Sequence, residues 1–253
     1  MSCDTPIRII KAGDVVKGKH YLEDVLVGCG KCPRCRLRRV NQWIFRLKQE
    51  ESNSGSSFFV TLTYDTDNVP ITDNGFMSLD KKDVQKFMKR LRKRVKKEYP
   101  GCRKIVYYLV GEYGEKTKFG RPHYHAIILN LPEIEILRQT WKHGDIHVGR
   151  VTNASIAYTM KYADKPRIIP VHGRDDRLRE FALMSKGIGK CYLENEEFVE
   201  YHQRDIRNCF IDSFGHKVIL PRYYREKIFN EEERQLQVKF ILKEIEKIGR
   251  AHV

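Results

Sequence analysis

The sequence predicts an α+β fold: a central antiparallel sheet with flanking helices, followed by a C-terminal helical and irregular extension. Three observations lead to this prediction. Residues 58–64 are rich in β-branched and aromatic side chains, as expected of a core strand. Residues 105–113 and 123–129 have the same character and flank a polar loop containing glycine, which predicts an antiparallel pair. Between the first strand and this pair, apolar residues recur at helical spacing.

That helix is predicted to begin after Ser78, a suitable N-cap, and to end before Pro100. Its buried face is expected to comprise Val84, Phe87, Met88, Leu91 and Val95. Residues 132–142 should form another helix and residues 145–151 another strand. A further helix should begin with Asn153 as its cap and continue through Lys165, because Pro166 cannot extend it.

We divide the chain into three parts, with a soft boundary near residue 170. Residues 1–50 form an N-terminal basic segment with the cluster Cys29-Gly30-Lys31-Cys32-Pro33-Arg34-Cys35 and an amphipathic helix after it. Residues 51–170 carry the strands and helices described above. Residues 171–253 form the C-terminal extension, which is rich in glycine loops and ends in a charged helix at about residues 230–247.

The composition favours a polyanionic partner, with nucleic acid first. The chain has 48 Lys and Arg against 33 Asp and Glu, a formal net charge of +15, and neutralised phosphates release counterions. The sequence contains no apolar run long enough to span a membrane and no signal-peptide pattern, so we expect a cytoplasmic protein without a membrane partner. In that compartment the seven cysteines should be thiols or metal ligands rather than disulfides.

A pair of histidines suggests a metal site. His123 and His125 alternate along a predicted strand, so both imidazoles point to one face and can reach one ion. Glu112 lies on the neighbouring strand, where an antiparallel hairpin would bring its carboxylate beside the rings. Glu115 is the competing third ligand, closer to the turn. Without a metal, the histidines would be hydrogen-bonded residues on a half-exposed strand.

A second motif lies on the helix after Asn153. Tyr158, Lys161, Tyr162 and Lys165 are spaced i, i+3, i+4 and i+7, which places them on one helical face. A tyrosine hydroxyl can attack phosphorus, and a lysine one turn away can neutralise phosphate oxygens. The structural alternative is a pair of half-buried aromatic residues flanked by lysines whose stems pack beside them.

In combination, these motifs resemble the HUH superfamily of Rep endonucleases. The resemblance rests on Thr61-Leu62-Thr63-Tyr64, Gly111-Glu112-Tyr113-Gly114, Arg121-Pro122-His123-Tyr124-His125 and the tyrosine helix. The Tyr-x-x-Lys-Tyr-x-x-Lys form is similar to that of two-tyrosine Reps of small circular single-stranded DNA phages. Cys3, the cysteine cluster and residues 184–189 resemble gokushovirus-type microvirus replication initiators.

The resemblance implies a ferredoxin-like palm in which Glu112, His123 and His125 hold Mg²⁺ or Mn²⁺. Tyr158 and Tyr162 would then be the nucleophiles, with Lys161 neutralising the phosphate. The implied function is rolling-circle replication initiation by nicking single-stranded origin DNA, through a 5′-phosphotyrosyl adduct, and by closing circles. The expected DNA contacts are Lys165, Arg121, Lys89 and Lys93.

The implied partners are a host polymerase and a host helicase in the bacterial cytoplasm. A host helicase is expected because Gly187-Ile188-Gly189-Lys190-Cys191 has neither the spacing nor the hydroxyl of a P-loop, and no other candidate is visible.

The N-terminal cysteines have two interpretations. Cys29, Cys32 and Cys35, with Cys3 as a fourth ligand, would make a structural zinc site, or they would be thiols at the start of a helix. Two other functions remain open. A single-tyrosine HUH transposase or relaxase would use the same chemistry, and a non-enzymatic cysteine-cluster DNA-binding regulator would use only the charge and the cysteines.

Overall fold

The computed structural model describes residues 3–16, 19–114, 120–163, 169–211, 215 and 217–237. Side chains of residues 9–25 and 161–163 lie outside this description. The chain forms two compact units, Met1–Trp43 and Ile44–Val253.

The first unit contains an antiparallel hairpin of β1 (Ile7–Val16) and β2 (Lys19–Val27). It is followed by α1 (Pro33–Ser52), which begins in this unit and ends in the second. The helix confirms the predicted amphipathic segment. The hairpin was not predicted, because charged residues and glycines interrupt its apolar pattern.

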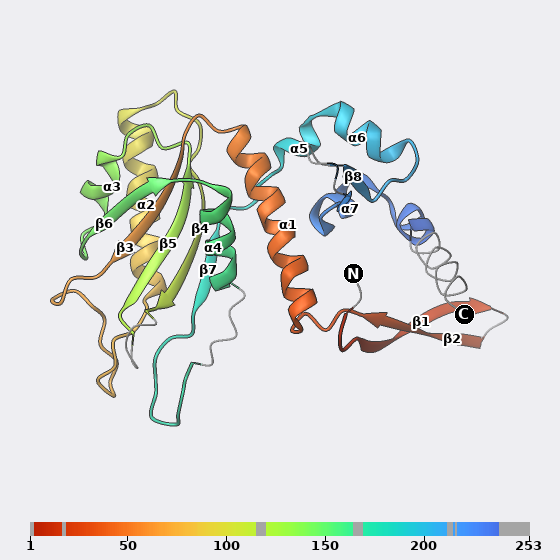
Figure 1. The fold of residues 1–253 in the computed structure, drawn as a ribbon, viewed down its shortest axis with the longest axis horizontal. Helices are drawn as coiled ribbons and strands as arrows, with labels where there is room; N and C mark the ends of the chain where they lie inside the picture. Colours follow the sequence, from red (N-terminus) through yellow and green to blue (C-terminus); the bar gives the residue numbers. More distant parts are fainter. Residues whose placement is uncertain are drawn as a thin grey trace. The chain divides into compact units, whose positions relative to one another are not determined.

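A five-stranded antiparallel sheet forms the centre of the second unit, in the order β6-β3-β5-β4-β7 (Figure 1). The strands are β3 (Ser57–Thr63), β4 (Val106–Tyr113), β5 (Pro122–Leu129), β6 (Ile146–Arg150) and β7 (Phe181–Met184). This confirms the predicted fold class and the β4–β5 pair. However, β7 comes from beyond the expected boundary near residue 170, so the sheet includes part of the predicted C-terminal extension. Its four residues are too few to show a strand periodicity.

The two faces of this sheet have different roles because side chains alternate along each strand. One face supplies Tyr124, Ala126 and Ile128 to the main core. The helix α2 (Lys81–Glu98) packs into this core, and α3 (Glu135–Thr140) joins it. The opposite face of β5 carries His123 and His125, and α4 (Asn153–Ala163) contacts β4 and β5. The buried face of α2 is the predicted one.

Two helix caps differ from the prediction by one or two residues. Asp80, not Ser78, caps α2 by accepting a hydrogen bond from the Lys82 amide at 2.6 Å. Ser78 is buried, and its hydroxyl instead accepts the Leu178 amide at 3.0 Å. Thr152, not Asn153, caps α4: its hydroxyl accepts the Ser155 amide at 3.1 Å, and the Ser155 hydroxyl accepts the Thr152 amide at 2.7 Å.

The C-terminal part of the second unit has a small core of its own. It contains α5 (Cys191–Glu194), α6 (Glu196–Gln203), β8 (Cys209–Ile211), β9 (Lys217–Ile219) and α7 (Arg222–Ile228). Tyr192, Leu220 and Tyr224 are buried there, and Phe45 of α1 packs against them. Residues 231–237 are helical, as predicted, and the rest of the expected charged helix lies outside the described residues. Among the helices that the structure describes, none has the length and apolar character to cross a membrane.

Candidate metal centre and tyrosine helix

Glu112, His123 and His125 meet on one face of the central sheet. In the β4–β5 pair, Glu112 lies opposite His123, and His125 is two residues further along the strand. The Nε2 atoms of His123 and His125 lie 2.7 and 3.1 Å from the same carboxylate oxygen, Oε1 of Glu112. One potential ligand atom from each of the three residues lies within 4.8 Å of the other two. The structure therefore brings together the three residues that the sequence predicted as a metal site.

The outer nitrogen of each imidazole is also held. Nδ1 of His123 donates to the Arg121 carbonyl at 3.0 Å, and Nδ1 of His125 lies 3.0 Å from the Thr61 hydroxyl. Bonds of this kind fix the ring orientation and direct Nε2 toward an ion. Thr61 was quoted in the sequence only as part of a strand motif, and its role beside His125 becomes visible only through the β3–β5 register.

The electrostatics of the three residues favour an ionised carboxylate. Burial raises the pKa of Glu112, but its hydrogen bonds to both histidines outweigh burial and lower the pKa below its ordinary value. Burial lowers the pKa of His123, whereas the bonds to Glu112 and to the Arg121 carbonyl raise it, with a net upward shift. Without an ion, the proton on His123 balances the buried carboxylate.

The donor set fits a divalent cation. Oε2 of Glu112 is buried and has no hydrogen-bond partner among the described residues, although its side chain is only 3% exposed. A buried oxygen without a partner is costly unless something else satisfies it. Two imidazole nitrogens and one carboxylate suit Mn²⁺ well and suit Mg²⁺ through the oxygen. Glu115, the competing ligand, lies outside the described residues.

Tyr124 holds the histidine pair from the other side of the sheet. Its side chain is fully buried, and its hydroxyl lies 2.8 Å from the Tyr64 hydroxyl and accepts the Asp80 amide at 2.9 Å. Gly111, opposite Tyr124 in the register, leaves room for the ring, because a Cβ there would lie 3.1 Å from it. The residue between the two histidines is thus an anchor for β5.

Tyr158 on α4 is beside the metal centre. Its ring centroid lies 5.2 Å from that of His125 in an edge-to-face arrangement, and its side chain is 40% exposed. Ile156, Thr159 and Met160 are the buried residues among the described side chains of α4. Lys161 and Tyr162 lie on the last turn of α4, and their side chains lie outside the description. The predicted site residue Lys165 is also outside the described residues.

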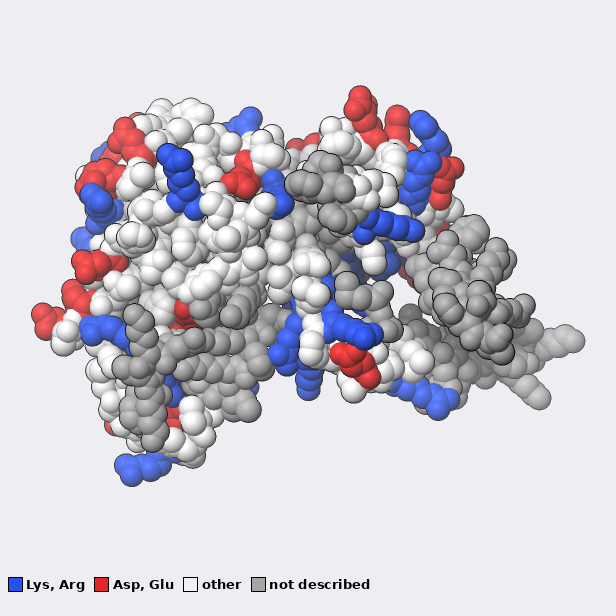
Figure 2. All heavy atoms as spheres, in the orientation of Figure 1, with Lys and Arg blue, Asp and Glu red and all other residues white. Residues whose placement is uncertain are grey.

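The other predicted DNA contacts lie in two different places. Arg121 precedes β5 next to the metal centre, where its guanidinium donates to the Tyr64 carbonyl at 3.2 Å. Lys89 and Lys93 are exposed on α2, which packs on the sheet face opposite the histidines. Figure 2 shows Lys and Arg side chains spread over the visible face, with Asp and Glu between them. The charge excess on this face is therefore not confined to one patch.

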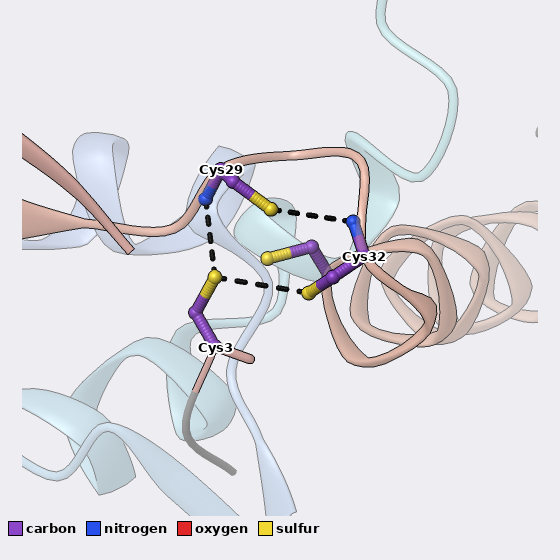
Figure 3. Close-up of side chains that lie close together, drawn as sticks. Cys3, Cys29 and Cys32 are labelled. Carbon is purple, nitrogen blue, oxygen red and sulfur yellow. Dashed lines mark hydrogen bonds between the residues drawn. The ribbon is translucent and has the colours of Figure 1, made fainter. Parts of the chain in front are cut away.

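The four predicted zinc ligands also come together, in the first unit. Cys3, Cys29, Cys32 and Cys35 place their sulfur atoms within 4.8 Å of one another (Figure 3). The Cys29 sulfur accepts the amides of Lys31 and Cys32 at 3.4 and 3.2 Å. A hydrogen bond from the Thr5 hydroxyl, followed by those from the two amides, lowers the pKa of Cys29 to about 5. The hairpin brings Cys3 beside a cluster more than twenty residues away in sequence. The group is compatible with metal binding.

Comparison with known proteins identifies relatives over nearly the whole chain. Residues 57–167 match a family model of replication-associated proteins that is described under the name ORF2. Replication-associated protein ORF2 of Spiroplasma virus 4 is 29% identical over 286 residues, which cover 99% of this chain and 87% of that protein. Replication-associated protein VP4 of Bdellovibrio phage phiMH2K is 29% identical over 254 residues, 89% of this chain and 76% of that protein. No solved structure gave a match. Residues 57–167 therefore form a replication-associated protein domain of the ORF2 family, in a chain related to phage replication-associated proteins.

Proposed function

We propose that this protein is a metal-dependent endonuclease that nicks and rejoins single-stranded origin DNA to initiate rolling-circle replication of a phage genome. Its relationship to phage replication-associated proteins supports a role in replication initiation. The observation that carries the proposed chemistry is the position of Tyr158, whose ring contacts His125 of the Glu112–His123–His125 group. A nucleophile and an electrophilic centre for one phosphate are then side by side.

Glu112, His123 and His125 would hold Mg²⁺ or Mn²⁺. The bound ion supplies Lewis-acid stabilisation of the charge that develops on the phosphate oxygens. Thr61 and the Arg121 carbonyl keep the imidazoles in place from their Nδ1 side. Because one sheet face presents all three ligands, the opposite side of the ion is left for a phosphodiester.

The tyrosine step would be a transesterification. The Tyr158 hydroxyl attacks phosphorus, the P–O3′ bond breaks, and the departing O3′ takes up a proton to become a free 3′-hydroxyl. The new bond is a 5′-phosphotyrosyl ester, so no bond energy is lost to water. Lys161, one turn from Tyr158 on α4, would neutralise the phosphate, and Lys165 would hold the flanking strand.

A second tyrosine would allow the circle to be closed. After one round of synthesis by a host polymerase, Tyr162 would cut the regenerated origin in the same manner. The 3′-hydroxyl released by this cut would attack the first phosphotyrosyl ester, which frees Tyr158 and closes the DNA. Strand separation would depend on a host helicase in the bacterial cytoplasm.

The test is a set of tyrosine variants in a nicking assay on single-stranded origin DNA with Mn²⁺. Tyr158→Phe or Tyr162→Phe alone should still form one denaturant-resistant protein–DNA adduct, because phenylalanine removes only the hydroxyl. The double variant should form none. Tyr201→Phe is a matched control, since Tyr201 has a comparable exposure of 39% but lies on α6.

The outcomes separate the alternatives. If one single variant forms no adduct while the other turns over like the wild type, the protein is a single-tyrosine HUH enzyme. If no variant, including the wild type, forms an adduct or a nick with any divalent metal, the chain is a non-enzymatic DNA-binding regulator and the proposal is wrong.

For the cysteine cluster we propose a structural Zn²⁺ held by four thiolates. Among the side chains described at residues 3–8 and 26–43, the buried ones are Cys32 and Cys35, so the described part of this unit has almost no apolar core. Small units of this kind need a metal or a cross-link to fold. The purified protein should contain one zinc per chain by elemental analysis. Cys29→Ser should lose it, and Cys102→Ser, at an exposed cysteine outside the cluster, should keep it. A zinc-free wild-type protein from zinc-supplemented cells would reject this site.

A further inference from the structure

The face of the sheet that carries the histidines continues beyond them across β3 to the edge strand β6. In the register, Thr61 of β3 pairs with His125 on one side and with His147 on the other. Side chains at paired positions project to the same face. His125, Thr61 and His147 therefore form one row, and His147 stands two strands, about 10 Å, from the metal ligand.

This half of the face is open to solvent. The residues of β3 that share it, Phe59, Thr61 and Thr63, are all only partly buried, whereas Val60 and Leu62 on the other face are fully buried. His147 is exposed, and no hydrogen bond or ion pair joins it to any other described residue. By contrast, α4 lies over the β4 and β5 side, where Tyr158 contacts His125. The tyrosine helix closes one side of the metal centre and leaves the β3–β6 side accessible.

The surroundings of His147 favour a phosphate as its partner. An imidazole can donate a hydrogen bond to a phosphate oxygen, and the Thr61 hydroxyl lies between His147 and the metal ligand. Asp145, in the neighbouring row next to Thr63, is exposed and would repel a phosphate there. The row through Thr61 is thus a more favourable track than the row through Thr63.

From this geometry we propose that His147 binds a backbone phosphate of the single strand next to the scissile one, so that the DNA leaves the metal centre across β3 and β6. The proposal rests on the proposed function for the position of the scissile phosphate. It assigns to β6 a DNA-binding role that none of the sequence motifs indicated. His147 would be a positioning residue, because it does not touch the reacting atoms.

The test measures binding separately from cleavage. A fluorescein-labelled oligothymidylate of about 16 nucleotides, near the upper site size of a single binding domain, is titrated with full-length protein in chelator. Fluorescence anisotropy should show binding about five- to tenfold weaker for His147→Ala, as expected for one lost hydrogen bond to a charged group. His172→Ala is the matched control, because His172 is another exposed histidine but lies in the loop before β7. It should bind within about twofold of the wild type, as is usual for a surface change away from any contact.

A second measurement locates the contact. Hydrogen–deuterium exchange should show slower exchange in a peptide covering residues 144–152 when the oligonucleotide is added, because an edge strand has one unpaired side. If His147→Ala binds like the wild type, or if this peptide is not protected, the inference is wrong. Nicking by the wild type together with normal binding by His147→Ala would reject this subsite and leave the proposed function intact. Weaker binding by His147→Ala without any nicking would reject the enzyme instead.

Discussion

Replacing Thr61 by valine should weaken metal binding without removing a metal ligand. The change deletes the hydroxyl that lies 3.0 Å from Nδ1 of His125 and keeps a side chain of similar volume. Losing such an outer partner typically reduces metal affinity about 10- to 100-fold. His125 is also stacked on Phe59, with centroids 5.5 Å apart, and packed against Tyr158. Because these rings still restrain the imidazole, we expect the lower end, about tenfold or about 1.4 kcal/mol.

The measurement is a Mn²⁺ titration without DNA, in which electron paramagnetic resonance reports the free ion. Thr63→Val is the matched control, since Thr63 lies on the same strand and face but its hydroxyl donates to the Asp145 carbonyl at 3.2 Å. It should change the dissociation constant by less than about twofold, because it holds no metal ligand in place, and both variants should keep the wild-type circular dichroism. Equal weakening by the two variants, or none by Thr61→Val, would refute the role given to this hydroxyl.

Three further predictions concern the metal ligands, the charge and the stability. His123→Ala should abolish nicking yet keep most of the affinity for single-stranded DNA in a binding assay, whereas parallel loss of both would contradict a separate metal centre. The logarithm of DNA affinity should fall steeply with the logarithm of salt, and reversing the charges of Lys89 and Lys93 should reduce the slope by about two; an unchanged slope would remove α2 from the DNA-binding surface. The buried Arg177, whose guanidinium donates to Asp175 at 2.8 Å, lowers the pKa of Asp175 below its ordinary value. This pair should therefore stabilise the fold above about pH 4 and lose that contribution as the pH falls toward the lower folded-state pKa. Asp175→Asn should cost about 3 kcal/mol near neutral pH in urea unfolding and flatten the acid dependence; an unaltered acid transition would show that another group controls it.

Much of the metal centre could be predicted from local pattern. Alternation along a strand puts His123 and His125 on one face, and a hairpin brings Glu112 next to them, so sequence spacing contains most of the geometry. Thr61 and His147 were out of reach of this reasoning. Their relation to His125 depends on how β3 pairs with β5 and β6, and strand pairing across long connections is not written in any local pattern.

The remaining differences have similar physical origins. The cap of α2 moved from Ser78 to Asp80 because both residues are good caps, and the Ser78 hydroxyl is used by a loop a hundred residues away. Cys3 joins the other cysteines through a hairpin whose strands the sequence did not reveal. The edge strand β7 is recruited by β4 rather than by its own composition.

The burial of Tyr124 has a consequence for how tightly the centre can select its ion. Any rotation of β5 that parted the two imidazoles would also pull the Tyr124 hydroxyl away from Tyr64 and from the Asp80 amide, inside a closed core. The separation of the two ligand nitrogens is therefore rigid, and the entropy of ordering them is lost when the chain folds rather than when the ion arrives. A rigid pair accepts only ions whose preferred bond lengths match its spacing. Substitutions at Tyr124, which no ion touches, should thus change the preference between metals as well as the strength of binding.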